Sequence, residues 1–215
     1  MSVTPVAVTL YTDIRQKILS GIWAPGVVLR QEDLARRYAT SRVPLREAFS
    51  RLEAEGFLVL RPRRGFAVVS LREDEIREIF DLRMVLESHA GQIATKAQKP
   101  GDMLVLEDLL DRMEATDTAH ATGLAEWCLL NRRFHDYILD CCNRPRLRRL
   151  LLQLRDQVEP YMRIELSVTG DVTEASRDHR EILSAMRSGD SELVGELCAI
   201  HCSRTARRLV ANLKP

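Results

Sequence analysis

Apolar residues recur at helical or strand spacing through most of the chain, and the interruptions divide it into two parts. In the first part, the pattern predicts three helices followed by two β-prone runs. These elements cover residues 9–21, 31–39, 42–55, 57–61 and 66–69. Residues 1–8 are predicted to form a loose arm. The first part therefore reads as a helix, a pair of short helices and a two-stranded hairpin.

The second and third predicted helices are joined by a tight turn. The hydroxyl of Ser41 is suited to cap the third helix, and Pro44 falls in its first turn, where a missing N–H costs little. Opposite its apolar face, this helix carries Arg42, Arg46 and Arg51. The pattern is typical of a helix-turn-helix whose second helix enters the major groove of DNA. Spacing alone also allows an ordinary αα-hairpin with solvated arginines.

A hairpin that directly follows such a helix is typical of a wing. Its predicted turn contains Arg63, Arg64 and Gly65. A basic tip beside a basic helix suits contacts with DNA phosphates, which position a protein on the duplex. The sequence thus predicts a winged helix-turn-helix DNA-binding domain over residues 1–70.

From residue 76 onward the apolar periodicity predicts six helices with short connections. They cover residues 76–98, 102–118, 122–142, 145–165, 173–188 and 190–212. Short connections favour antiparallel neighbours, so the prediction is an antiparallel six-helix bundle over residues 76–212. The fold class is therefore mainly α, with residues 71–75 as the junction between the two domains.

Charge is distributed unevenly along the chain. Residues 1–70 contain 11 lysines and arginines against 6 acidic residues, whereas residues 71–215 contain 21 against 25, within a net charge of +1. A basic head on an acidic body indicates a polyanion as the partner of the head alone. No apolar run approaches the roughly 18 residues of a membrane span, and no signal peptide is recognisable. We therefore expect a cytoplasmic protein without a membrane partner.

The five cysteines are odd in number and lack the spacing of a disulfide scaffold, which favours buried free thiols. They are Cys128, Cys141, Cys142, Cys198 and Cys202. Cys198 and Cys202, at i and i+4, also allow metal binding or oxidant sensing, although core packing is the simpler interpretation.

Residues 17–69 resemble the winged helix-turn-helix of GntR-family bacterial transcription regulators. The resemblance is carried by Ile18–Gly21, Pro25–Gly26, Leu34–Ala35, Ser41–Ala48, Leu52, Glu55–Phe57 and Arg64–Gly65. Residues 76–210 resemble the all-helical FCD effector domain of the FadR-like branch. This resemblance is carried by Asp81–Arg83, Glu87, Phe134–His135, Asn143–Arg144, His179–Ile182 and Gly189–Asp190. Six helices resemble the VanR-type subgroup more than the seven-helix FadR type.

The resemblance implies a homodimeric repressor or activator that binds palindromic operator DNA. It also implies that arginines at positions 42 and 46 contact bases and phosphates, and that the wing tip reaches the minor groove. Many members carry a basic residue where this chain has Gln31 or Glu32, so that contact is missing here. An acidic side chain at this place can instead accept a hydrogen bond from cytosine.

Histidines on the predicted bundle helices form a candidate metal site. Asn131 and His135 share one helix face at i and i+4, while His179 and His201 lie on the last two helices. Imidazoles with a side-chain oxygen suit Zn²⁺, Ni²⁺ or Mn²⁺. The resemblance implies a divalent metal at these four positions, with asparagine replacing the more usual aspartate. The alternative is a set of isolated core histidines.

A metal held by neutral ligands keeps its positive charge and attracts carboxylates, so we expect a small organic acid as the effector. The resemblance makes Arg83 a second anchor for that acid, while an ion pair with Glu87, one turn later, is the alternative. A three-histidine site also suits metal-assisted hydrolysis. The chain lacks the nucleophile and glycine-loop motifs of common hydrolases, so we expect no enzyme. A ligand-free dimerisation module is a further alternative.

Overall fold

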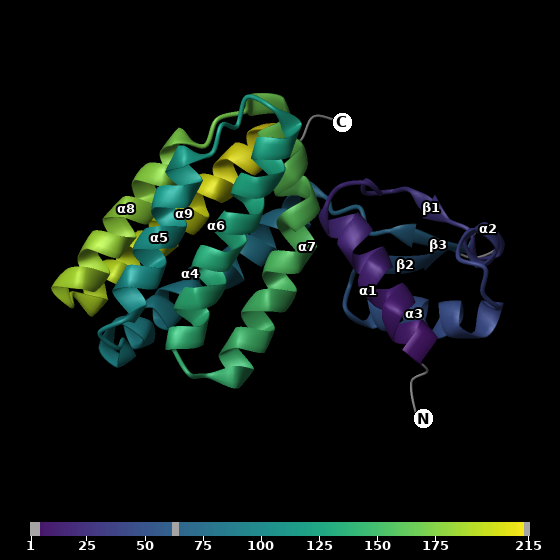
Figure 1. Cartoon of the computed structure of the whole chain (residues 1–215), viewed down its shortest axis with the longest axis horizontal. Helices are drawn as coiled ribbons and strands as arrows, with labels where there is room; N and C mark the ends of the chain where they lie inside the picture. The colour runs from purple at the N-terminus through teal and green to yellow at the C-terminus, as the bar shows by residue number, and fades with distance from the viewer. Residues whose placement is uncertain (1–4, 62–64, 213–215) are drawn as a thin grey trace. The chain divides into compact units, whose positions relative to one another are not determined.

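The structure is a computed structural model that describes residues 5–61 and 65–212. The chain divides into two compact units. The first ends at Arg72 and also takes in Asp156–Tyr161, and the second consists of Glu73–Arg155 and Met162–Pro215. Helices dominate, and the strands form a single small sheet among the described residues (Figure 1). This confirms the mainly α prediction.

The first unit combines three helices with a small sheet. Its elements are α1 (Pro5–Leu19), β1 (Val28–Leu29), α2 (Gln31–Arg37), α3 (Arg42–Ala54), β2 (Leu58–Arg61) and β3 (Gly65–Val68). The pair α2–α3 and the hairpin β2–β3 reproduce the predicted order of helix-turn-helix and wing. The loose arm is wrong for residues 5–8, because α1 already begins at Pro5 and Ala7 is buried. Proline is well tolerated in the first turn of a helix.

The sheet has one strand more than predicted. Its order is β1-β3-β2 with antiparallel pairing, and Leu29 lies opposite Phe66. The sequence analysis predicted no strand at β1, because its two residues are too few to show an alternation of apolar and polar positions. The wing therefore has a third strand, which ties it to the chain segment before α2.

Apolar faces of the three helices and the sheet meet in one core. On α3 the predicted face is fully buried, and its Phe49 ring meets Phe66 of β3 edge-on at 5.0 Å between centroids. Edge-to-face aromatic pairs add to the gain from apolar burial. Gly56 ends α3 with a φ of 80°, a conformation that glycine adopts without strain. This core holds α3 so that its opposite face remains exposed.

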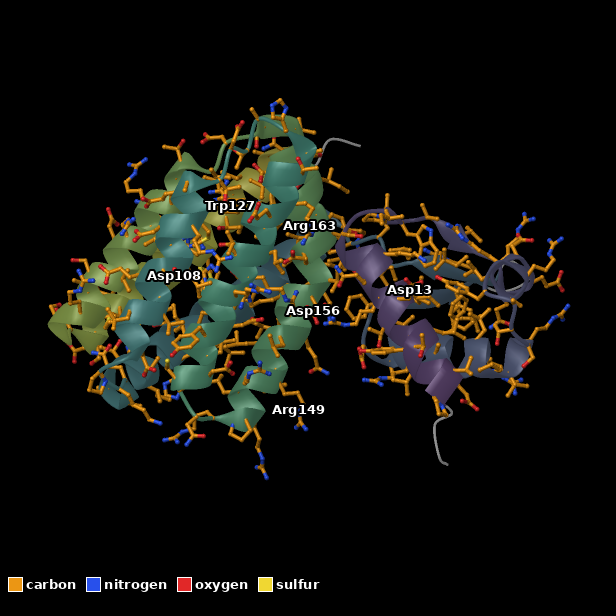
Figure 2. All side chains as sticks on the ribbon, viewed as in Figure 1. Asp13, Asp108, Trp127, Arg149, Asp156 and Arg163 are labelled. Carbon is orange, nitrogen blue, oxygen red and sulfur yellow. The ribbon has the colours of Figure 1, made fainter. Side chains whose placement is uncertain are left out.

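Over its described residues, the second unit is the predicted bundle of six helices. They are α4 (Glu73–Ala97), α5 (Asp102–Ala115), α6 (Ala121–Cys141), α7 (Pro145–Thr169), α8 (Thr173–Ser188) and α9 (Ser191–Asn212). Apolar side chains fill the space between these helices, while charged ones such as Asp108 and Arg149 extend outward (Figure 2). Among the described residues, no helix is both long and apolar enough to cross a membrane.

Several helix boundaries differ from the prediction, two of them for clear local reasons. Helix α4 begins at Glu73, inside the predicted junction, because three acidic residues in its first turn favour a helix N-terminus. Helix α7 extends to Thr169 and ends where Gly170 takes a φ of 62°.

Helices α4 and α9 approach closely at Gly91 and Gly195. A Cβ atom on Gly91 would lie 2.9 Å from a methyl carbon of Val194.

Candidate functional site

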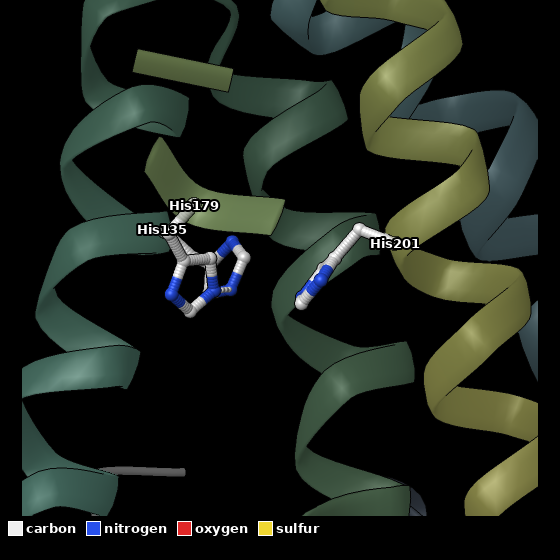
Figure 3. Close-up of side chains that lie close together, drawn as sticks. All are labelled: His135, His179 and His201. Carbon is white, nitrogen blue, oxygen red and sulfur yellow. Dashed lines mark hydrogen bonds between the residues drawn. The ribbon is translucent and has the colours of Figure 1, made fainter. Parts of the chain in front are cut away.

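Three histidines from three helices meet inside the second unit. His135 on α6, His179 on α8 and His201 on α9 are all buried. One ring nitrogen from each lies within 4.8 Å of the others, and Nε2 of His135 is 3.2 Å from Nε2 of His179. Figure 3 shows the three rings pointing toward one another from their separate helices. The alternative of isolated core histidines is therefore wrong as a description of the geometry.

Burial keeps two of these imidazoles neutral. It lowers the pKa of His135 and His179 well below the ordinary value, and nearby cationic groups, including Arg155, act in the same direction. A neutral imidazole keeps a lone pair on one nitrogen and is the form that binds metals. The environment therefore leaves these two rings in the protonation state that a metal site requires.

Asp178 orients the third imidazole, and the sequence analysis did not single it out. Its Oδ2 lies 3.0 Å from Nδ1 of His201. The tautomer with the proton on Nδ1 satisfies this contact and leaves a lone pair on Nε2. Carboxylates commonly hold metal-binding histidines in this way. The available signal was the position of this carboxylate directly before His179 in the sequence.

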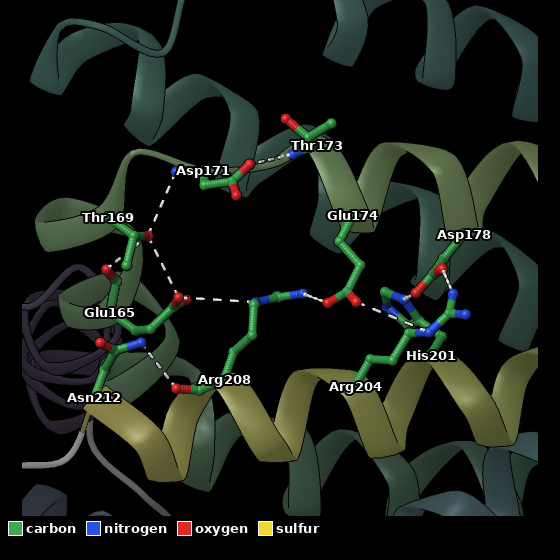
Figure 4. Close-up of polar contacts among 10 residues, drawn as sticks. All are labelled: Glu165, Thr169, Asp171, Thr173, Glu174, Asp178, His201, Arg204, Arg208 and Asn212. Carbon is green, nitrogen blue, oxygen red and sulfur yellow. Dashed lines mark hydrogen bonds and ion pairs between the residues drawn. The ribbon is translucent and has the colours of Figure 1, made fainter.

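The carboxylate of Asp178 is charged. Burial alone would raise its pKa, but the contacts with His201 and Arg204 outweigh this effect, so the pKa is lowered. Arg204 bonds to the second oxygen of Asp178, and Arg208 continues the chain of ion pairs to Glu174 at 2.9 Å (Figure 4). Asp178 is thus fixed from both sides, which restricts the ring of His201.

The donor set fits a divalent metal ion. Two nitrogens bound to one tetrahedral Zn²⁺ at about 2.1 Å would lie about 3.4 Å apart, close to the observed 3.2 Å between His135 and His179. Asn131 lies one turn before His135 on α6 and is 8% exposed. Its Oδ1 is buried and accepts no hydrogen bond within the described part of the chain. A buried oxygen of this kind calls for an explanation, and a bound ion supplies one.

A small cavity adjoins the histidines. Its volume is about 10 Å³, roughly the space of one water molecule. Its polar lining comes from Glu87, His135, Arg155 and His201. In this conformation the cavity is too small for an organic acid, so its wall would have to open for an effector to bind.

Arg83 forms the ion pair that the sequence offered as an alternative. Its Nε lies 2.8 Å from Oε1 of Glu87, and both side chains are buried. Burial alone would raise the pKa of Glu87, but the charges of Arg83 and Arg155 outweigh it and the pKa is lowered. Through Glu87, the arginine is connected to the wall of the cavity beside the histidines.

The predicted DNA-reading residues lie on the exposed side of α3. Arg42 and Arg46 are exposed, and Pro44 lies within the first turn. Ser41 occupies the N-cap position, but its hydroxyl makes no capping hydrogen bond within the described structure, so that prediction is wrong. Arg42 Nη2 lies 2.7 Å from Oε1 of Glu32 on α2. The arginines thus point away from the core of the unit.

At the wing tip, the predicted contacts at Arg63 and Arg64 lie outside the described residues. Gly65 is described and begins β3 with a φ of 87°. A Cβ atom there would lie 3.2 Å from the carbonyl oxygen of Leu29, so the glycine lets β1 approach β3 closely. This structural requirement is independent of any contact with DNA.

The remaining candidate residues lie elsewhere. His89 and His120 are exposed, as expected for histidines outside the metal pattern. Cys198 and Cys202 are buried free thiols, and burial raises the pKa of both above the usual range. Neutral buried thiols are poor metal ligands, which favours the core-packing interpretation.

Comparison with known proteins supplies the family. The family model described as "Bacterial regulatory proteins, gntR family" matches residues 7–68, and the FCD domain model matches residues 78–204. The chain is 30% identical to the "HTH-type transcriptional repressor GlaR" of Escherichia coli (strain K12) over 198 residues, which cover 89% of this chain and 90% of that protein. This chain belongs to the GntR family of bacterial transcription regulators and carries an FCD domain. It is accordingly a transcription regulator and not an enzyme.

Two further similarities agree with this assignment. The "Gluconate operon transcriptional repressor" of Bacillus licheniformis is 26% identical over 199 residues, covering 90% of this chain and 81% of that protein. The solved structure of E. coli McbR/YncC superposes with a TM-score of 0.83 at 23% identity, covering 98% of this chain and all of that one. At that identity the structural match shows the shared fold alone.

Proposed function

We propose that this GntR-family regulator is a repressor controlled by a small carboxylate, which binds a metal-assisted pocket in the FCD domain. It would act in the bacterial cytoplasm as a homodimer on a short inverted-repeat operator. Its six-helix domain favours the VanR-type subgroup over the seven-helix FadR type. The observation that carries the proposal is the meeting of three buried imidazoles with an aspartate behind one of them.

The first unit would read the operator through α3. Arginines at its N-terminal end make bidentate contacts with guanine when the helix lies in the major groove. The residues proposed for DNA contact are Ser41, Arg42, Pro44 and Arg46, with Arg63, Arg64 and Gly65 at the wing tip. The exposed positions of Arg42 and Arg46 support this role. We propose repression and not activation because the relatives named above are described as repressors.

In the second unit, His135, His179, His201 and Asn131 would hold Zn²⁺, Ni²⁺ or Mn²⁺. The bound metal would supply a positive charge to a carboxylate effector. The protein's own part is to keep the imidazoles neutral, to orient His201 through Asp178 and to exclude bulk water. Arg83 would be the second anchor of the effector, once its ion pair with Glu87 rearranges.

Regulation would then be a coupling between two sites of the dimer. An effector too large for the present cavity must displace part of the wall formed by α4, α6, α7, α8 and α9. A change in the bundle that alters the spacing of the two dimer-related reading heads would break the match to the operator half-sites. This requires that the effector bind the two arrangements with different affinity.

Elemental analysis and native mass spectrometry of the purified full-length chain test the metal site directly. We expect about one divalent ion per chain, and added Ni²⁺ should quench Trp127, whose ring centroid lies 6.5 Å from that of His179. Trp23→Phe should keep this quenching and Trp127→Phe should lose it, because these are the two tryptophans of the chain. A protein that takes up no metal would instead be a ligand-free dimerisation module.

The effector is tested on the metal-loaded protein. A panel of small organic acids, including hydroxy acids and dicarboxylates, should contain members that raise the melting temperature and release operator DNA. An Arg83→Ala variant should lose the shift in melting temperature with its metal content unchanged. If no carboxylate raises the melting temperature of the metal-loaded protein, the organic-acid part of the proposal is wrong.

A further inference from the structure

An exposed ion pair links the two helices of the helix-turn-helix. Glu32 lies near the start of α2, and Arg42 is the first residue of α3. Oε1 of Glu32 is 2.7 Å from Nη2 of Arg42, and the side chains are 67% and 68% exposed. Both border a surface hollow of about 610 Å³ at the start of α3. The pair therefore lies on the surface that would face DNA.

Fold stability does not account for this pair. Exposed ion pairs contribute little, because water and salt screen them and both side chains lose freedom. The two helices are already joined through a core that contains Leu34, Leu45 and Phe49. A carboxylate on a surface that approaches phosphates also opposes binding through its charge. Its presence therefore calls for an explanation in terms of recognition.

We propose that Glu32 is a specificity-determining residue that acts through Arg42. Its carboxylate engages one N–H donor of the guanidinium and holds the side chain over the N-terminus of α3. The remaining donors are then presented to a guanine in a restricted orientation, which reduces the conformational entropy lost on binding. This inference rests on the proposed function, because it requires α3 to read the operator.

The same contact lowers affinity for DNA of any other sequence. Where no guanine is in place, Arg42 remains paired and brings almost no net charge to the phosphates. Non-specific binding is driven by the release of counterions from those phosphates, so a neutralised arginine weakens it. The ratio of operator affinity to non-specific affinity therefore rises in two ways. The contact of Arg42 with its guanine is better oriented, and its contact with the phosphates of other DNA is weaker.

Asp33 provides a matched control. It is the next residue of α2 and forms a similar exposed ion pair with Arg36. Asp33→Ala removes the same charge and frees an arginine, but it leaves the pair of Glu32 and Arg42 intact. Any effect that Glu32→Ala has beyond Asp33→Ala therefore belongs to Arg42.

The experiment measures the affinity of the full-length protein for its operator, defined by in vitro selection, and for a random duplex over a range of salt concentrations. Both variants should bind the random duplex several-fold more tightly, with the salt slope steeper by about one. Glu32→Ala should in addition lower the ratio of operator to random affinity about tenfold more than Asp33→Ala does. Equal ratios in the two variants would overturn the inference.

A double variant excludes direct reading of a base by Glu32. In an Arg42→Ala background, Glu32→Ala should cause no further loss of base preference. A further loss at a cytosine would mean that the carboxylate itself accepts from the base, which overturns the positioning role. If the wild-type chain selects no DNA sequence at all, the proposed function fails first, and that outcome is distinct from the others.

Discussion

The two units place their candidate functional groups in opposite environments. In the first, Arg42 and Arg46 lie on the exposed face of α3, and the apolar face opposite only supports them. In the second, His135, His179 and His201 lie among the buried residues of the bundle. A helix that reads DNA needs its charged side chains exposed at the surface, whereas a metal site needs its ligands fixed in position and shielded from bulk water.

The difference shows where each unit is tolerant of change. An exposed arginine can be replaced at little cost to the fold, since water solvates its neighbours. A buried polar group left without its partner costs about 1–3 kcal/mol. Substitutions on the exposed face of α3 should therefore affect DNA binding alone, while substitutions in the histidine cluster should affect both ligand binding and stability.

The largest expected effect comes from His135→Ala. It removes one of three converging imidazoles, so metal affinity should fall by more than the roughly 100-fold that outer partners of a metal site account for. Calorimetric titration of the metal-free protein with Zn²⁺ or Ni²⁺ measures this. His120→Ala is the matched control, because its side chain is 79% exposed, and it should bind like the wild type. Equal affinities in the two variants would remove the metal site from the proposal.

Asp178→Asn should have the next largest effect. The amide keeps the shape but loses the charge that holds the proton on Nδ1 of His201, so metal affinity should fall about 10- to 100-fold. Arg204→Ala removes the other partner of Asp178 and keeps its contact with His201, so the loss should be much smaller. If Arg204→Ala lowers metal affinity as much as Asp178→Asn does, the whole ion-pair network supports metal binding. The orientation of the His201 ring alone would then not explain the affinity.

Arg46→Ala tests the exposed side of the comparison. Loss of a base contact should weaken operator binding by about 1–3 kcal/mol, or roughly 5- to 150-fold in Kd, with an unchanged melting temperature. Arg112→Ala, an exposed arginine of α5, should leave both quantities unchanged. Fluorescence anisotropy with a labelled operator fragment measures the affinity. Wild-type binding by Arg46→Ala would contradict the assignment of α3 as the reading helix.

The same contrast explains what the sequence could predict. On α3, apolar spacing predicted the buried face, and the opposite face, which carries the candidate arginines Arg42 and Arg46, is exposed. In the bundle, periodicity places the histidines on core-facing stripes, and the resemblance to a known family was needed to treat them as ligands. Nothing in the spacing indicates that three helices bring their rings within 4.8 Å.

Other features were not predictable because they depend on tertiary contacts. The contact between Asp178 and His201 joins two helices. The close approach of α4 and α9 depends on Gly91 and Gly195, which look like breaks in a helical pattern when each is considered alone. Strand β1 is visible only through its pairing with β3. Whether a segment forms a helix or a strand follows from its local sequence pattern. Which residues it contacts elsewhere in the chain can be read only from the assembled fold.

The smallest expected effect concerns a polar contact of the second unit away from the histidines. Asp102 accepts hydrogen bonds from the backbone N–H of Lys99 at 2.6 Å and from the hydroxyl of Tyr137 at 2.9 Å. The backbone hydrogen bond in particular lowers the pKa of this carboxyl group. Asp102→Ala should reduce the free energy of unfolding by about 1 kcal/mol at neutral pH, with no change in metal affinity.

The pH dependence of this effect has a definite sign. Because the pKa of Asp102 is lower in the folded than in the unfolded chain, its contribution is complete above the unfolded value of about 3.9 and is lost as the pH falls through the folded value. Urea unfolding at about pH 7 and at about pH 3 should therefore show the difference between wild type and variant shrinking in acid. Asp108→Ala, which removes only a 3.5 Å contact with Arg112, should give almost no difference at either pH. A difference that grows in acid would mean that the folded state protonates Asp102 more readily, against its observed hydrogen bonds.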